Sequence, residues 1–174
     1  TAYVPSGGKG AIPKITGALR EIGVRVKVVA DIDLLSDGVN LRNLVEALGG
    51  AWDDLEREWR RLDAAVRDGV SALTPEQIKE EIRKLLHQSP EGQLPKGDIS
   101  EAMKQTSPWA MVKKHGKTLI PRGDAQSLFD SLDAKLRDLG IFVVPVGEAE
   151  GFCPDVGSHG PRFVSNLFAS TPLD

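Results

Sequence analysis

Apolar residues in this chain follow two patterns: short continuous runs, and a three- to four-residue spacing. One strand-like stretch covers residues 24–33, where β-branched valines dominate, as a buried strand requires, and it ends in Asp31-Ile32-Asp33. A second apolar run covers residues 141–146, and a shorter one covers residues 2–4. We therefore expect strands in these three segments.

The three- to four-residue spacing predicts helices that pack through one face. It occurs over residues 11–22, 39–48, 52–70, 74–87, 99–106, 124–139 and 161–168. Gly23, Gly49 and Gly140 come directly after predicted helices, where glycine commonly ends a helix. Thr74-Pro75 has the cap and first-turn proline of a helix start.

The order of these elements predicts the fold class and the domain organisation. A strand, a glycine-rich loop, a helix and a strand open the chain, and such a βαβ unit implies parallel pairing. We expect an α/β domain with a parallel sheet flanked by helices, formed by residues 1–50 and 117–174. Residues 51–116 are too polar for the sheet and are expected to form an inserted helical subdomain.

Composition and charge exclude several classes of protein but do not indicate a single function. The 174 residues carry a net charge of −3, so any contact with nucleic acid has to be local. Cys153 is the single cysteine, which excludes an internal disulfide and a cysteine zinc cluster. No apolar run approaches the roughly 20 residues of a membrane span, so we expect no membrane contact and a reducing cytoplasm.

Four carboxylates follow the two longer predicted strands. Strand alternation places Asp31 and Asp33 on the same side at the carboxyl end of the first, and Glu148 and Glu150 follow the second. If the strands are parallel neighbours, all four meet at one edge, where oxygen ligands suit Mg²⁺ or Mn²⁺. The alternatives are that the aspartates cap the next turn and that the glutamates lie in a solvated loop.

Two lysine-containing segments are candidates for phosphate binding. Backbone N–H groups of Gly7-Gly8-Lys9-Gly10, at a helix start, can face a phosphate while Lys9 adds charge, although the Walker spacing is missing. Lys113-Lys114-His115-Gly116-Lys117, close to Trp109, forms a basic stretch suited to a phosphate backbone. A plain glycine turn and a solvated helix face are the respective alternatives.

Three of these segments together resemble a Toprim domain, a compact Rossmann-like α/β module. They are Ser6-Gly7-Gly8-Lys9-Gly10, Val29-Ala30-Asp31-Ile32-Asp33 and Val143-Val144-Pro145-Val146-Gly147-Glu148-Ala149-Glu150. Their order, and a helical insertion before the late Pro-Val-Gly-Glu-x-Glu segment, are similar to those of the OLD-family (overcoming lysogenization defect) ATP-dependent nucleases. The resemblance covers most of the chain.

The resemblance implies a metal-dependent DNA endonuclease. Asp31 and Asp33 would hold two divalent ions, Mg²⁺ or Mn²⁺, with Glu148 or Glu150 completing the second site, and Lys9 would stabilise charge on the scissile phosphate. It also implies DNA, an N-terminal ATPase region of the same protein and a homodimer as partners. Toprim domains usually open with a strand that carries a glutamate, and none precedes Tyr3. We therefore expect this chain to be a C-terminal piece of a longer protein.

Two other functions stay open at this stage. A haloacid-dehalogenase-like phosphohydrolase also sets Asp-x-Asp after a strand and would use Asp31 as nucleophile. Leu35 and the glycine-lysine loop ahead of the motif depart from that family. The third reading is a non-catalytic Toprim-like interaction module, which would bind DNA or a partner without either aspartate.

Overall fold

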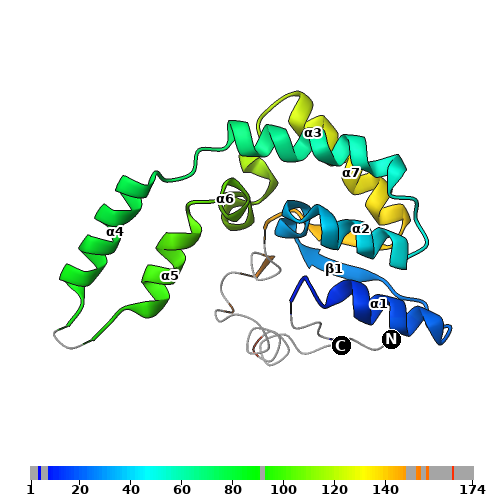
Figure 1. Cartoon of the computed structure of the whole chain (residues 1–174), viewed down its shortest axis with the longest axis horizontal. Coiled ribbons are helices and arrows are strands. Elements are labelled where there is room, and N and C mark those ends of the chain that lie inside the picture. Colours follow the sequence, from blue (N-terminus) through cyan, green and yellow to red (C-terminus); the bar gives the residue numbers. More distant parts are fainter. Residues whose placement is uncertain are drawn as a thin grey trace.

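The computed structural model of the chain describes residues 4, 8–90, 93–147, 152, 153, 156 and 166. Over these residues the sheet consists of β1 (Val28–Asp31) and β2 (Ile141–Val144), which pair in parallel (Figure 1). Val28 lies opposite Ile141 and Asp31 opposite Val144. The predicted parallel pairing of these two segments is confirmed.

Helices surround this small sheet, so the chain is a mixed α/β protein with more helix than strand. They are α1 (Ile12–Glu21), α2 (Gly38–Ala47), α3 (Asp53–Gly69), α4 (Pro75–Gln88), α5 (Lys96–Lys104), α6 (Pro108–His115) and α7 (Asp124–Asp138). Two 3₁₀ helices, η1 (Ile32–Ser36) and η2 (Gly116–Leu119), follow β1 and α6. None of the helices in the described part of the chain is long and apolar enough to cross a membrane.

Both strands are shorter than predicted. The partner of β1 starts at Ile141, directly after Gly140 ends α7, so residues 24–27 have no strand of β2 beside them. Beyond Val144, Pro145 has no N–H to donate, and the chain turns. The expected burial of the whole valine run is also wrong, because alternation along β1 leaves Val29 exposed on the face opposite Val28 and Ala30.

Within the described residues the predicted helices are confirmed, with one helix missed and one start displaced. Thr74 and Gln77 form a capping box at the start of α4, and Gly23 follows α1 with a φ of 80°. Helix α6 was not predicted, because only its last three residues had been singled out, as part of the basic stretch 113–117. Helix α5 begins three residues before the predicted start. The predictions at residues 2–4 and 161–168 fall mainly outside the described residues.

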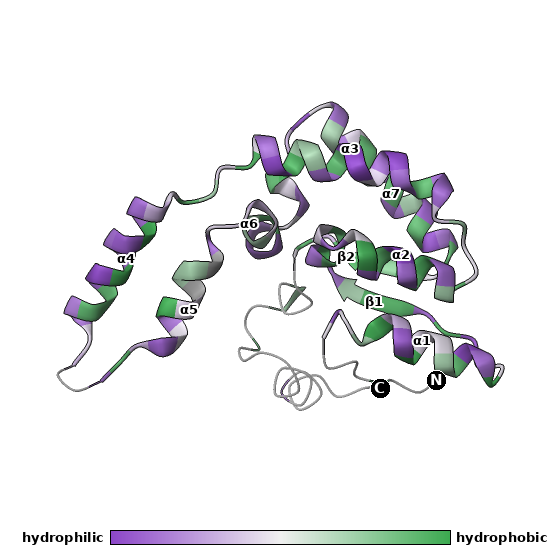
Figure 2. Cartoon of the chain, viewed as in Figure 1, coloured by the Kyte–Doolittle hydropathy of each residue, from purple (hydrophilic) through white to green (hydrophobic). Residues whose placement is uncertain are grey.

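One hydrophobic core joins the sheet to most of the helices. Helix α7 packs against β2 and α3, α1 packs against α2, and α6 packs against η1. Figure 2 shows hydrophobic colours along β1 and mixed colours around the helices, as expected for helices that bury one face. Fully buried core residues come from η1, α2, α3, α7 and β2: Ile32, Leu34, Leu41, Leu44, Leu62, Val66, Leu132, Leu136 and Ile141.

The predicted insertion, residues 51–116, has two structurally different parts. Helices α3 and α6 bury Leu62, Val66, Trp109 and Val112 in the same core as the sheet. Helices α4 and α5 instead form a hairpin that extends away from the body (Figure 1). Within residues 51–116, the α4–α5 hairpin is therefore the part that stands apart.

Candidate functional site

Asp31 and Asp33 lie side by side where β1 ends. Asp31 is the last residue of the strand, and Asp33 lies in the first turn of η1. Ile32, which separates the two aspartates, and Leu34, which follows Asp33, are buried. The carboxylates face outward, with side-chain exposures of 35% for Asp31 and 23% for Asp33. The 3₁₀ turn that follows β1, and not the strand alternation assumed from the sequence, thus brings both carboxylates to one rim.

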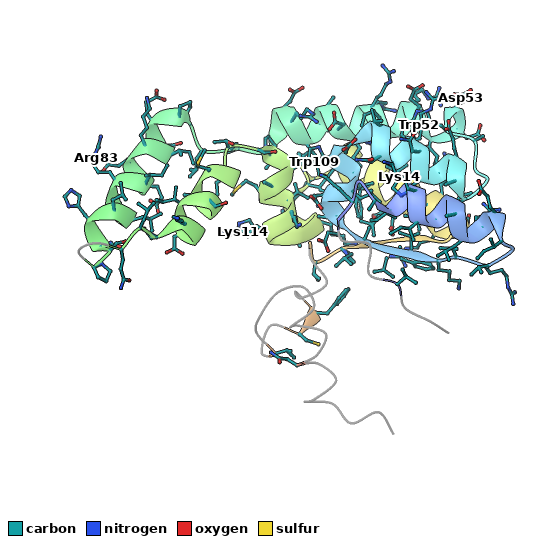
Figure 3. The ribbon with its side chains drawn as sticks, turned by 60° about the horizontal axis from the view of Figure 1, so that its bottom comes forward. Lys14, Trp52, Asp53, Arg83, Trp109 and Lys114 are labelled. Carbon is teal, nitrogen blue, oxygen red and sulfur yellow. The ribbon has the colours of Figure 1, made fainter. Side chains whose placement is uncertain are left out.

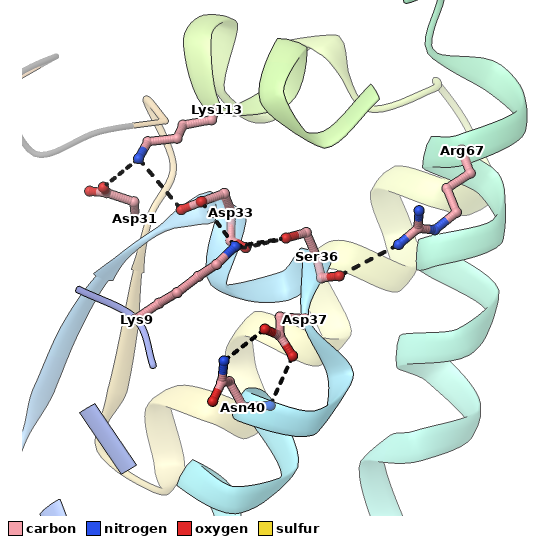
Figure 4. A network of polar contacts seen from close by, with 8 residues as sticks. All are labelled: Lys9, Asp31, Asp33, Ser36, Asp37, Asn40, Arg67 and Lys113. Atoms are coloured by element: carbon pink, nitrogen blue, oxygen red, sulfur yellow. Dashed lines mark hydrogen bonds and ion pairs between the residues drawn. The ribbon is translucent and has the colours of Figure 1, made fainter. Parts of the chain in front are cut away.

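Lys9 reaches this rim from the loop before α1. Its Nζ lies 3.2 Å from Asp33 Oδ2, and it also donates to the Asp33 carbonyl oxygen at 3.3 Å and to Ser36 Oγ at 3.1 Å. The Ser36 hydroxyl in turn donates to the same carbonyl at 2.7 Å (Figure 4). Three acceptors from one 3₁₀ turn therefore fix the position of the Lys9 ammonium group.

Lys113 reaches the rim from α6. Its Nζ lies 3.2 Å from Asp31 Oδ2 and 3.8 Å from Asp33 Oδ1 (Figure 4). The backbone position of Lys113 follows from the burial of Val112 and Trp109, and Trp109 Nε1 donates to Asp63 Oδ1 on α3 at 2.7 Å. One ammonium group is thus shared by the two carboxylates of the Asp-x-Asp segment.

The turn that carries Asp33 and Ser36 is fixed by α3. Trp59 Nε1 donates to the Leu35 carbonyl oxygen at 2.8 Å, and the Arg67 guanidinium lies 3.5 Å from the Ser36 carbonyl oxygen. An ion pair of 2.8 Å with Asp63 orients Arg67 and raises its pKa, chiefly through the side-chain hydrogen bond. The insertion helix α3 therefore positions the acidic turn.

The alternative prediction, that the aspartates cap the next turn, is not supported at Asp31. Asp31 occupies the cap position of η1 without a side-chain cap bond. Asp37 caps α2 instead, accepting from Asn40 N at 3.0 Å and from Asn40 Nδ2 at 2.7 Å. The backbone hydrogen bond from Asn40 lowers the pKa of Asp37. Capping by Asp37 favours another role for Asp31 and Asp33.

The loop after β2 passes between η1, which carries Asp33, and the end of α6, which carries Lys113. The Gly147 carbonyl oxygen accepts from Ile32 N at 3.0 Å, and the Pro145 carbonyl oxygen accepts from Lys117 N at 2.8 Å. These bonds bring Gly147 to the turn that joins Asp31 to Asp33. Glu148 and Glu150, the predicted ligands that follow in the sequence, lie outside the described residues. The predicted gathering of four carboxylates therefore stays a prediction.

Asp31 and Asp33 are the described residues that could act as donors to a divalent cation. The described residues contain no group of three or more His, Cys, Asp or Glu side chains that could hold a metal ion. Mg²⁺, however, usually keeps several waters and takes only one or two carboxylates from a protein, together with substrate phosphates. Two outward-facing carboxylates on one rim, close enough to share Lys113, fit that donor set.

Gly7, Gly8 and Lys114 are the other residues that were predicted to bind phosphate. Gly8 has a φ of 133°, which favours glycine, whereas Gly7 lies outside the described residues. Lys114 is exposed on α6 (Figure 3) and takes no part in the pairing with Asp31 and Asp33, since neighbouring helix positions face different directions. Ser36 was missed, and the only signal for it was a hydroxyl in the turn directly after Asp-x-Asp.

A groove of about 770 Å³ begins at Lys9 and Ser36 and continues between α2 and α3. Its arginines are each paired with a carboxylate of their own helix: Arg42 with Glu46 at 2.8 Å, and Arg67 with Asp63 at 2.8 Å. The groove therefore borders the site at Lys9 and Ser36, and its arginine charges are balanced within their own helices.

The chain was compared with models of protein families, with curated proteins and with solved structures, and none of them matches it.

Proposed function

We propose that this chain is the nuclease part of a Toprim-like, OLD-family ATP-dependent nuclease and that it hydrolyses phosphodiester bonds of DNA. The observation that carries this proposal is the meeting of Asp31, Asp33, Lys9 and Lys113 at the carboxyl end of β1. That edge of an α/β sheet is the usual position of ligands. Two carboxylates and two ammonium groups there can hold a cation and a phosphate side by side.

Each side chain has a defined task in this proposal. Asp31 and Asp33 would hold two divalent ions, Mg²⁺ or Mn²⁺, and Glu148 or Glu150 would complete the second site. When bound, such ions supply an activated water and stabilise the leaving oxygen. Lys9 holds a positive charge next to the carboxylates, where negative charge develops on the scissile phosphate.

The proposed partners extend beyond the active site. Lys113 and Lys114 on α6 contact the DNA backbone, and the groove between α2 and α3 leaves room for substrate next to Lys9. We further propose an N-terminal ATPase region in the same protein, a homodimer and a cytoplasmic location.

The test replaces one metal ligand in the intact protein that contains this chain. Asp31→Asn should reduce nicking of supercoiled DNA in Mg²⁺ or Mn²⁺ by about two orders of magnitude or more, since a ligand of the reacting centre is lost. Asp68→Asn, an exposed position on α3, is the matched control and should nick at the normal rate. Undiminished nicking by the Asp31 variant would contradict the proposal.

A phosphohydrolase is the second candidate, favoured by the two ammonium groups around Asp31 and Asp33. In that reaction an Asp31 carboxylate oxygen attacks phosphorus, the leaving oxygen departs with a proton, and water then hydrolyses the phosphoaspartate. A phosphorylated Asp31 peptide, detected by mass spectrometry after rapid acid quenching, would favour it. DNA binding that survives loss of both aspartates, without any hydrolysis, would instead favour a non-catalytic module.

A further inference from the structure

The two lysines of the site are held in different ways. Lys9 contacts the Asp33 carboxylate, but its Nζ is also fixed by the Asp33 carbonyl oxygen and by Ser36 Oγ, all within one turn. Lys113 contacts the carboxylates of both Asp31 and Asp33, at 3.2 and 3.8 Å. Only the second arrangement places one cation between the two acidic side chains of the pair (Figure 4).

That position is the one a divalent cation would need. Two carboxylates held side by side repel each other unless a positive charge lies between them. The Lys113 ammonium supplies that charge now, with its side chain 31% exposed and therefore next to solvent. An ammonium group and a divalent ion would repel each other if both stayed there.

We propose that Lys113 is the resident counter-ion of Asp31 and Asp33 and is displaced when a divalent cation binds. Lys113 thereby sets the affinity of the site for metal and holds the carboxylates together before metal arrives. This inference rests on the proposed metal-dependent function, but it concerns a residue of α6 rather than the metal ligands. The backbone of α6 stays in place, because Trp109 and Val112 are buried and only the long side chain swings out.

Displacement also gives the ammonium group a second position. A substrate phosphate bound next to the cation would present oxygens to the released side chain, and lysine binds phosphate as a mobile point charge. The phosphate then replaces the carboxylates as the negatively charged partner of Lys113. Metal and phosphate binding would support each other through this exchange.

The experiment compares Mn²⁺ binding by calorimetry in the wild-type chain and in Lys113→Met, Lys114→Met and Lys113→Arg. The first two variants lose the same charge from adjacent positions of α6, but only Lys113 contacts the carboxylates. Lys113→Met should bind Mn²⁺ roughly three- to tenfold more tightly than Lys114→Met, because the ammonium group shared by Asp31 and Asp33 no longer has to be displaced. Lys113→Arg keeps the charge and should bind with nearly wild-type affinity.

Thermal unfolding provides an independent readout. Without metal, Lys113→Met should have a lower Tm than Lys114→Met, because the carboxylates lose their shared counter-ion, and Mn²⁺ should restore it. Equal or weaker Mn²⁺ binding by Lys113→Met than by Lys114→Met would overturn the inference. If the wild type binds Mn²⁺ and nicks DNA in that case, the proposed function stands; if no variant binds Mn²⁺, both proposals fail.

Discussion

Gly147 lies where the loop after β2 passes between η1 and α6. Its φ is 103°, and a Cβ atom built on it would lie 1.9 Å from the Lys113 carbonyl oxygen. Its own carbonyl oxygen accepts from Ile32 N, between the two aspartates of the site. The close contact of two backbones therefore requires glycine, and it fixes the distance between Lys113 and the acidic turn.

At this residue scale we predict that Gly147→Ala is strongly destabilising. The added methyl group meets backbone, which cannot swing aside, so the free energy of unfolding should fall by roughly 3 kcal/mol or more. Gly23→Ala is the matched control, since Gly23 also has a positive φ of 80° but open space around it. The free energy of unfolding of Gly23→Ala should fall by only about 1–2 kcal/mol. Equal losses in denaturant unfolding would contradict the contact.

At the scale of elements, α3 is attached to α7 by polar contacts as well as by the core. Lys135 Nζ on α7 lies 2.8 Å from Glu58 Oε1 on α3, and the Ser131 hydroxyl lies 3.2 Å from Glu58 Oε2. The hydrogen bond from Lys135 is the largest cause of the lowered pKa of Glu58. The ion pair thus joins the predicted insertion to the helix that packs on β2.

We predict that this pair contributes to stability only when Glu58 is ionised. A double-mutant cycle with Glu58→Gln and Lys135→Met should give a coupling of about 0.5–1 kcal/mol at pH 7. Because folding lowers the pKa of Glu58, the stabilisation is present above the ordinary glutamate pKa of about 4.3 and is lost as the pH falls through the lower folded value. A coupling that persists at pH 2.5 would contradict an ionic origin.

At the scale of the whole molecule, the described residues divide into a body and the α4–α5 hairpin. Leu62 on α3 is fully buried in the core that includes both strands. Ile78 on α4 is also buried, but the main contacts of α4 are with α5. Substitutions at these two positions should therefore have effects of different extent.

We predict a global effect for Leu62→Ala and a local one for Ile78→Ala. The first should lower the free energy of unfolding by about 2–5 kcal/mol, as expected for a cavity in a shared core. The second should speed amide hydrogen exchange in α4 and α5 while leaving exchange in α3 and α7 unchanged. Faster exchange throughout the molecule in Ile78→Ala would show that the hairpin and the body unfold together.

The sequence by itself determined the positions of most helices and the paired segments of both strands. These features depend on neighbours in the chain: apolar spacing, glycine and proline at helix ends, and the alternation of a strand, all of which local sterics decide. Even so, local patterns could not show that residues 24–27 lie outside the strand, because the extent of β1 depends on where β2 begins.

Only the tertiary structure decided which part of residues 51–116 belongs to the core, and which cations meet the aspartates. The apolar stripe of α3 has the same spacing whether it faces the sheet or another helix, so periodicity alone could not assign Leu62. Lys9, Asp33 and Lys113 come from three separate elements, and the ion pairs between them form only after the helices pack. Long-range packing places those charges together, and that information is not contained in any single segment.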